Sequence, residues 1–291
     1  MPNLRKLVAD ELAAPVDPRV RAFAVAIASK HEGASRAVLF YGSCLRQKQL
    51  EGLMLDFYLI VSTYADAYGK RWLAAANRMI PPNVFYAEDG GLVAKYAVLS
   101  EADFKRECGP AAQSTSVIAR FAQPARLVWA SDAKAKAAAV DSVSQCGPTL
   151  LARTAPLMPK GTPVLELWKR AFQLTFGAEL RAERTDRSTV IVDSEPERYQ
   201  EFGDAALAQV KAGNRKAATR WWKRMQRKGK LLSIVRLAKA SITFAGGADY
   251  IAWKVNRHAG TAIQLKPWQR RWPLLAGLSL LPRLLKSGAI R

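Results

Sequence analysis

The sequence has little of what holds small secreted or metal-binding domains together. Only three cysteines occur in 291 residues, and none of them forms a CxxC pair. His31 and His258 are the only histidines that could join them at a metal. A disulfide framework and a zinc site are therefore both disfavoured, and we expect a reducing, cytoplasmic compartment.

The sequence also lacks a hydrophobic run long enough to span a bilayer. Residues 1–13 mix charged and apolar side chains, unlike the continuous apolar stretch of a secretory signal. The apolar stretch from Trp272 to Pro282 is about half of the roughly 20 residues that a spanning helix needs, and arginines close it on both sides. We expect this segment to lie on a membrane rather than to cross one.

Acidic residues are almost absent from the last third of the chain. The formal net charge of +21 comes from 45 basic and 24 acidic residues. Residues 205–291 hold 19 of the basic residues but only Asp249 among the acidic ones, so they carry +18, whereas residues 1–204 carry +3. Such an excess indicates a polyanionic partner, either nucleic acid or an anionic membrane.

Apolar and aromatic runs predict an α+β fold in the near-neutral part, where a 49% hydrophobic chain can bury a sizeable core. Strands are expected over 37–41, 53–61, 83–86, 92–99 and 127–129, with a hairpin turn at 88–91, where two glycines allow a positive φ. Helices are expected over 20–28, over 134–143, and around Trp168 and Phe172 after a proline-rich break near 155–163. We predict a first domain over residues 1–150, a helical domain over 151–210 and a basic amphipathic region over 211–291.

Two of the predicted strands carry polar residues that point to phosphate chemistry. Gly42 and Ser43 end the first strand, and Asp56 interrupts the second, which reads LMLDFYLIV. A Gly-Ser turn lets backbone N–H groups and a hydroxyl approach a triphosphate, and a neighbouring carboxylate can hold Mg²⁺ against the same phosphates. Because an unpaired buried carboxylate would cost on the order of several kcal/mol, Asp56 is expected to bind a cation. This is the outline of a nucleotidyltransferase palm, although Tyr58 stands where a second carboxylate usually follows.

Further motifs follow in a fixed order along the chain. They are Tyr41-Gly42-Ser43, Leu55-Asp56-Phe57, Val84-Phe85-Tyr86, Lys95-Tyr96-Ala97, Arg120-Phe121-Ala122-Gln123-Pro124 and Ala178-Glu179-Leu180-Arg181. Over roughly residues 36–205 this order resembles the mitochondrial-type phosphatidate cytidylyltransferases. These belong to the translocator assembly and maintenance family of peripheral CDP-diacylglycerol synthases, which has bacterial relatives. The resemblance implies a palm with a mixed β-sheet, a winged-helix-like domain that completes the active site, and a membrane-binding carboxy-terminal segment.

The resemblance also implies a reaction, in which CTP and phosphatidate give CDP-diacylglycerol and pyrophosphate with Mg²⁺ as cofactor. Asp56 and Glu179 would hold the metal and, with Lys95, form the catalytic set. The nucleotide-binding residues implied are Tyr41, Gly42, Ser43, Lys95 and Arg181. Cys44 and Ala97 depart from the family pattern, which commonly has glycine at both places, and are expected to add side chains near the phosphate site.

The basic region has two competing interpretations. Eight basic residues between 215 and 230 surround Ala218, Trp221, Trp222 and Met225, whose helical spacing predicts an interfacial helix. Interleaved aromatics could also stack on nucleic-acid bases. The apolar segment at 272–285 favours a membrane instead, so nucleic acid is the disfavoured partner. Membrane contacts are predicted for Trp221, Trp222, Lys223, Arg224, Arg270, Arg271 and Trp272, on a protein attached peripherally to the inner face of the membrane.

Two other functions fit the same sequence. A nucleotidyltransferase of this outline could act on an RNA end or a protein hydroxyl. A degenerate palm could instead serve as a non-catalytic adaptor at a membrane surface, binding neither CTP nor Mg²⁺. The residues do not by themselves determine the nucleobase, the acyl-chain preference or the oligomeric state.

Overall fold

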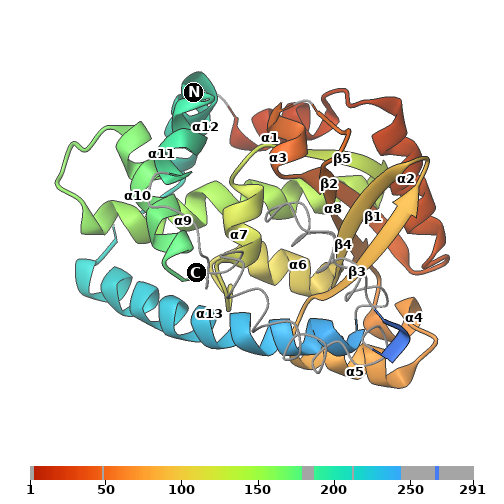
Figure 1. The fold of residues 1–291 in the computed structure, drawn as a ribbon. Coiled ribbons are helices and arrows are strands. Elements are labelled where there is room, and N and C mark those ends of the chain that lie inside the picture. The colour runs from red at the N-terminus through yellow and green to blue at the C-terminus, as the bar shows by residue number, and fades with distance from the viewer. Residues whose placement is uncertain (1–2, 48, 179–186, 212, 244–265, 269–291) are drawn as a thin grey trace.

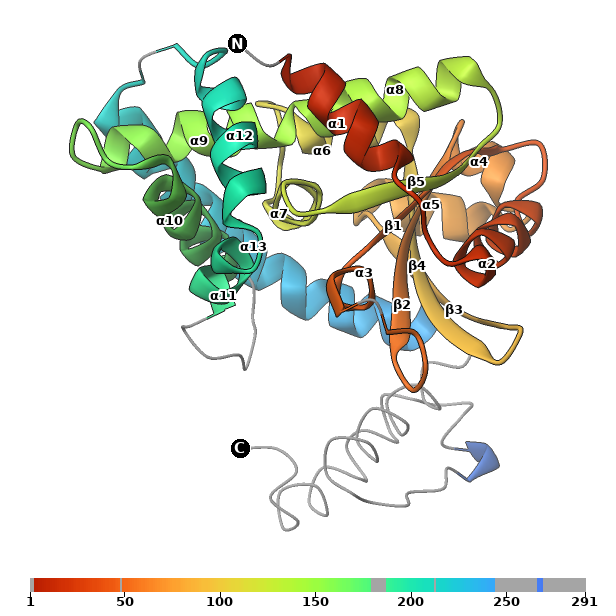
Figure 2. The same ribbon diagram turned by 90° about the horizontal axis from the view of Figure 1, so that it is seen from above.

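The computed structural model describes residues 3–47, 49–178, 187–211, 213–243 and 266–268, and it is built around a five-stranded mixed sheet (Figures 1 and 2). The strands are β1 (Ser35–Tyr41), β2 (Met54–Val61), β3 (Asn83–Asp89), β4 (Leu92–Ser100) and β5 (Ala125–Ala130). Their order across the sheet is β3-β4-β2-β1-β5. β2 and β4 pair in parallel, and the other neighbours pair antiparallel. The predicted α+β class with a mixed sheet is confirmed.

Helices cover both faces of this sheet. They are α1 (Leu4–Ala13), α2 (Pro18–Ser29), α3 (Ser43–Gln47), α4 (Tyr64–Ala67), α5 (Arg71–Met79), α6 (Glu101–Cys108), α7 (Ser116–Phe121), α8 (Ala133–Ser144), α9 (Cys146–Thr154), the 3-10 helix η1 (Ala155–Leu157), α10 (Val164–Phe176), α11 (Arg187–Asp193), α12 (Pro196–Leu207) and α13 (Arg215–Thr243). Each strand and helix that the sequence predicts over residues 20–176 lies within or overlaps one of these elements.

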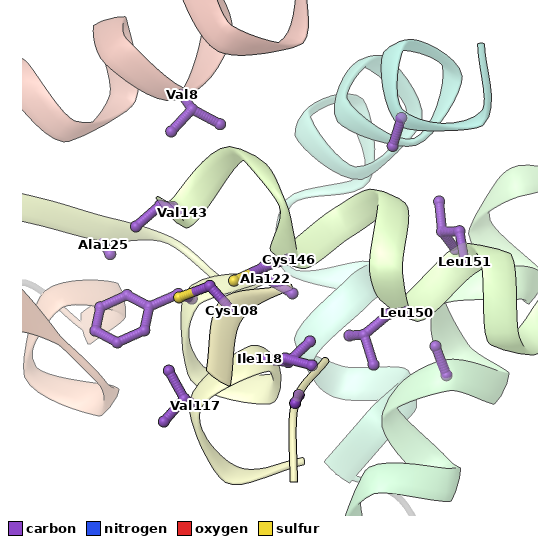
Figure 3. Packing of buried hydrophobic residues seen from close by; sticks show 14 of the residues in the cluster. Val8, Cys108, Val117, Ile118, Ala122, Ala125, Val143, Cys146, Leu150 and Leu151 are labelled. Atoms are coloured by element: carbon purple, nitrogen blue, oxygen red, sulfur yellow. The ribbon is translucent and has the colours of Figure 1, made fainter. Parts of the chain in front are cut away.

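Alternation along the strands divides the core into two clusters. Tyr58 and Ile60 of β2 belong to the cluster that includes α1 and α6 to α10, whereas Phe57 and Leu59 belong to the cluster that includes α2. Successive side chains of a strand point to opposite faces, which places Asp56 on the same face as Tyr58. Figure 3 shows part of the first cluster, where buried side chains of α1, α6, α7, α8 and α9 meet.

The helices that follow the sheet share this first cluster. Leu150, the last residue of the predicted first domain, lies inside α9 and is fully buried. Trp168 of α10 stacks on Phe172 and donates a hydrogen bond to the carbonyl of Tyr199 in α12, with 2.9 Å between nitrogen and oxygen. One core therefore continues across the predicted boundary. Within residues 151–178 and 187–211 the chain is helical, and no strand that could form a wing is seen there.

The basic helix α13 packs along the body instead of standing apart from it. It contacts α9, α10 and η1, and it reaches β3 at the far side of the sheet (Figures 1 and 2). Ala218, Trp221, Trp222 and Met225 face the body and are buried. The Trp222 Nε1 donates to the carbonyl of Arg153 at 2.9 Å, and the Arg153 guanidinium lies over the Trp221 ring.

The burial of these two indoles corrects one prediction. Trp221 and Trp222 were expected to contact a membrane, and this is wrong for the structure described, because their apolar stripe joins the protein core. Lys223 and Arg224 are exposed, as a surface role requires. The other predicted membrane contacts, at 270–272, lie outside the described residues. Within the described part of the chain no helix is long and apolar enough to cross a membrane.

Candidate active site

Strand pairing brings three of the predicted site residues into one row. Tyr41 of β1 pairs with Asp56 of β2, and Asp56 pairs with Lys95 of β4. Paired residues point to the same face of a sheet, so the three side chains lie next to one another. The Lys95 Nζ is 3.2 Å from the Asp56 Oδ1. Asp56 therefore has a cationic partner, as its place in an apolar strand required, and that partner is an ammonium group.

Gly42 closes the site on the β1 side. It has a φ of +97°, and a Cβ built on it would lie 2.7 Å from the Asp56 Oδ2. A side chain at this position would meet the carboxylate as well as force an unfavourable backbone conformation. Ser43 follows as the first residue of α3. The glycine thus lets the backbone of the turn approach Asp56 closely.

If the site binds Mg²⁺-nucleotide, as the sequence predicts, Gly42→Ala is expected to lower that affinity by at least about tenfold, a loss of about 1.4 kcal/mol, because the new methyl group displaces the Asp56 carboxylate. The positive φ alone should destabilise the fold by roughly 1–2 kcal/mol. Gly33→Ala is the matched control, because Gly33 has a φ of +80° and open space around its Cβ position. Denaturant unfolding and nucleotide titration of both variants test this. Equal nucleotide affinity in the two variants would contradict the role of Gly42.

Tyr41 contributes a neutral hydroxyl to the site. Its ring packs with those of Tyr58 and Phe121, at centroid distances of 5.4 and 5.7 Å. Burial, reinforced by the negative charge of Asp56, raises the pKa of the Tyr41 phenol well above its usual value, and Arg120 opposes this shift. The phenol therefore keeps its proton at neutral pH and can donate a hydrogen bond, but it cannot act as a base there.

Two arginines beside the site were not among the predicted site residues. Arg120 of α7 interacts with Tyr41, and its Nη1 also donates to the carbonyl of Ser116 at 2.5 Å. Arg46 lies on α3, three residues after Ser43, and its Nη1 donates to the Oε1 of Gln123 at 3.0 Å. Arg120 stands in one of the ordered sequence motifs, which was the available signal for it. Nothing in the sequence distinguished Arg46 from Lys48, the other basic residue of the connection between β1 and β2.

The two residues that depart from the family pattern, Cys44 and Ala97, lie in different places relative to the site. The thiol of Cys44 points away from the site into the cluster around α2, and its Sγ donates to the carbonyl of Met54 at 3.2 Å. The expectation that Cys44 adds a side chain near the phosphate site is therefore wrong. Ala97 lies two residues beyond Lys95 on the same face of β4 and is buried. Its methyl group fills core space beside the site.

The side chains that could ligate a metal ion decide whether one could bind at this site. Glu179 and Arg181 lie outside the described residues, and within the described ranges no three His, Cys, Asp or Glu side chains gather as a metal site. Mg²⁺ is often held by one or two carboxylates together with substrate phosphates. Asp56 fits that pattern as a single, partly exposed carboxylate beside a glycine turn, with Lys95 at its Oδ1.

Comparisons with known proteins add little to this geometry. No family model matches the sequence, and no curated protein matches it. Among solved structures, the chain is similar to a nucleotidyltransferase-like protein from Exiguobacterium sibiricum 255-15, with a TM-score of 0.29 and 8% identity, over 94% of this chain and 93% of that chain. So remote a likeness carries no functional argument, and the site is interpreted from its own residues.

Proposed function

We propose that the protein is a nucleotidyltransferase and that it transfers a cytidylyl group from CTP to phosphatidate. The observation that carries the proposal is the convergence of Gly42, Asp56 and Lys95 at one end of the three inner strands, where a close backbone approach, a carboxylate and an ammonium group meet. Those are the groups that bind and neutralise a triphosphate. The choice of CTP and phosphatidate rests on the family that the ordered motifs resemble.

The proposed step is a direct displacement at phosphorus. A phosphate oxygen of phosphatidate forms a bond to the α-phosphorus of CTP, and the bond from that phosphorus to the bridging oxygen breaks, which releases pyrophosphate. The attacking phosphate is already anionic, so the step needs no strong base. That requirement agrees with the site, where Tyr41 keeps its proton and Lys95 is paired with Asp56.

Different residues of the chain would bind the triphosphate and the metal ion. Lys95 and the Gly42–Ser43 turn would hold the triphosphate, and Asp56, with Glu179 as second ligand, would hold Mg²⁺. The metal would offset charge on the phosphates. Arg181 is the further residue proposed to neutralise phosphate charge. Arg120, which interacts with Tyr41, would strengthen the positive potential around the nucleotide.

We also propose that the protein attaches to an anionic membrane, and that Trp221 and Trp222, which are buried, take no part in this contact. α13 contains no acidic residue, and Arg220, Lys223, Arg224 and Arg227 are exposed along it. Basic residues near an anionic leaflet each contribute about 1 kcal/mol of attraction, which salt weakens. Together with Arg270, Arg271 and Trp272, these cations would bring the enzyme to its lipid substrate.

The reaction is tested by incubating the protein with phosphatidate vesicles, Mg²⁺ and each of the four nucleoside triphosphates, followed by mass detection of the liponucleotide. We expect CDP-diacylglycerol with CTP and a strong preference for CTP over the other three. If no liponucleotide forms with any of the four nucleotides, the proposed lipid reaction is refuted. Transfer to RNA in its place would favour the RNA-end enzyme, and the absence of any thermal shift with CTP would favour the non-catalytic adaptor.

A further inference from the structure

A cavity of about 450 Å³ lies at the opposite ends of β2 and β4 from Asp56 and Lys95. Its walls come from the ends of these strands, the turn from α5 into β3, the α6 to α7 region and α13. The strands pair Val61 with Ser100 at this end, five residues beyond the pair of Asp56 and Lys95. At about 3.3 Å per residue, the cavity lies roughly 16 Å along the strands from the candidate active site.

The two acidic side chains in the wall of the cavity, Asp103 and Glu107, already accept hydrogen bonds from other groups of the protein. The Glu107 carboxylate accepts hydrogen bonds from backbone N–H groups of the loop between α6 and α7, at 3.1 to 3.3 Å, and from the Arg106 Nε at 3.1 Å. The Asp103 carboxylate accepts from the Tyr64 hydroxyl and from the Arg106 Nη1, both at 2.5 Å. These two carboxylates share Arg106 and otherwise accept from neutral donors. The wall holds four basic side chains, those of Arg78, Arg106, Lys228 and Arg236, against the two carboxylates, which is a net charge of +2.

Two other cations of the wall, Arg78 and Lys228, pair with no carboxylate among the described residues. Lys228 of α13 donates from its Nζ to the Oε1 of Gln113 at 2.9 Å, and that amide carries no charge. Arg78 of α5 also lines the cavity, and no carboxylate in the described residues pairs with it. Arg236 lines the same wall, where it donates to the Pro81 carbonyl at 2.9 Å. Positive charge in a concave wall attracts anions, and guanidinium groups suit phosphate oxygens.

Part of the wall is apolar, beside polar side chains such as those of Ser62, Thr63 and Ser100. Leu99, Val117, Leu232 and the side chain of Met79 line the cavity together with two prolines. Met79 is 77% exposed, so its side chain is available to a ligand in the cavity. Methionine adapts its shape to different ligands more readily than branched residues do. A ligand that satisfies this wall needs an apolar portion as well as an anionic group.

We propose that this cavity is a second binding site, which takes a small amphiphilic phosphate. Arg78 and Lys228 bind the phosphate group, and the apolar portion lies against Met79, Leu99 and Leu232. The volume falls within the roughly 300–1,000 Å³ of small-molecule sites. A ligand here bridges α13 to the turn between α5 and β3, where Arg236 already joins the two. The proposal does not depend on nucleotidyl transfer.

Calorimetric titration of the full chain with hexyl phosphate tests the site. We expect saturable binding that falls at least tenfold in Arg78→Ala/Lys228→Ala and stays within twofold of wild type in Lys230→Ala. Lys230 is the matched control because it lies on the same helix, two residues away, and is exposed. Inorganic phosphate should bind at least tenfold more weakly than hexyl phosphate. Equal binding of the two would overturn the apolar part of the proposal, and equal binding by the double variant would overturn the site.

A second measurement locates the ligand without any substitution. Acetylation of lysines in the wild-type protein, followed by mass spectrometry, compares Lys228 with Lys230. Hexyl phosphate should slow the labelling of Lys228 at least threefold and leave Lys230 unchanged. Equal rates at Lys228 with and without saturating hexyl phosphate would place the ligand elsewhere and overturn the proposal.

Discussion

Asp56→Asn is expected to remove nucleotidyl transfer almost completely, with a loss of rate of roughly 10²–10³-fold or more, because it deletes the charge of the carboxylate proposed to hold Mg²⁺. The amide is nearly isosteric with the carboxylate, so the side chain should still fit beside Gly42. It cannot form the ion pair with Lys95, whose Nζ is 3.2 Å from Oδ1 in the wild type. Single-turnover product formation with CTP and phosphatidate vesicles measures the effect.

The control for this prediction is Asp141→Asn. Asp141 is an exposed carboxylate on α8 that pairs with Arg5, so its substitution makes the same chemical change away from the site. Both variants should float with anionic vesicles as the wild type does, because neither alters the exposed cations of α13. Turnover by Asp56→Asn within tenfold of the wild type would show that Asp56 does not hold the metal and would refute the proposed mechanism.

Trp222→Ala is expected to destabilise the protein by about 3–5 kcal/mol, the range for a large aromatic side chain removed from a core. The Trp222 ring is 2% exposed and packs edge to face with Trp221, and its Nε1 donates to the Arg153 carbonyl. The substitution therefore removes packing and leaves the half-buried Arg153 carbonyl without its donor. Denaturant unfolding, read by circular dichroism, measures the loss.

Trp268→Ala is the matched control, because that tryptophan is 45% exposed. It should change the free energy of unfolding by no more than about 0.5 kcal/mol. Under conditions where both variants are folded, Trp222→Ala should bind anionic vesicles as the wild type does. A Trp222→Ala variant of wild-type stability that lost vesicle binding would show that the indole faces a membrane, and the docked position of α13 would be wrong.

Local patterns predicted most of the sheet, since each strand is a compact apolar run. β2 is an example, because LMLDFYLIV must be buried on both faces and its single aspartate must find a cation. The sequence did not say which cation. Lys95 stands 39 positions from Asp56, and only the parallel pairing of β2 with β4 puts their side chains together. Pairing across such a separation is a tertiary property, so a local pattern does not contain it.

Helix α13 shows a second limit of local patterns: its apolar stripe could be predicted, but the surface that the stripe contacts could not. The spacing of Ala218, Trp221, Trp222 and Met225 predicted an amphipathic helix, and α13 has one buried stripe. An apolar stripe has the same pattern whether it faces a bilayer or a protein core, because both exclude water. The choice depended on whether the rest of the chain offered a matching surface. α9, α10 and η1 offer one.

By itself, the sequence determined the α+β composition, the places of the strands, the glycine turn before α3 and the concentration of positive charge after residue 204. These follow from periodicity, glycine chemistry and charge, which are properties of neighbouring residues. The tertiary structure decided the rest. It paired Asp56 with Lys95, buried the thiol of Cys44, turned the tryptophans of α13 inward and formed an open cavity between α13 and the sheet. Each of these needs contact between segments far apart in the chain, and such contacts exist only after the core has formed.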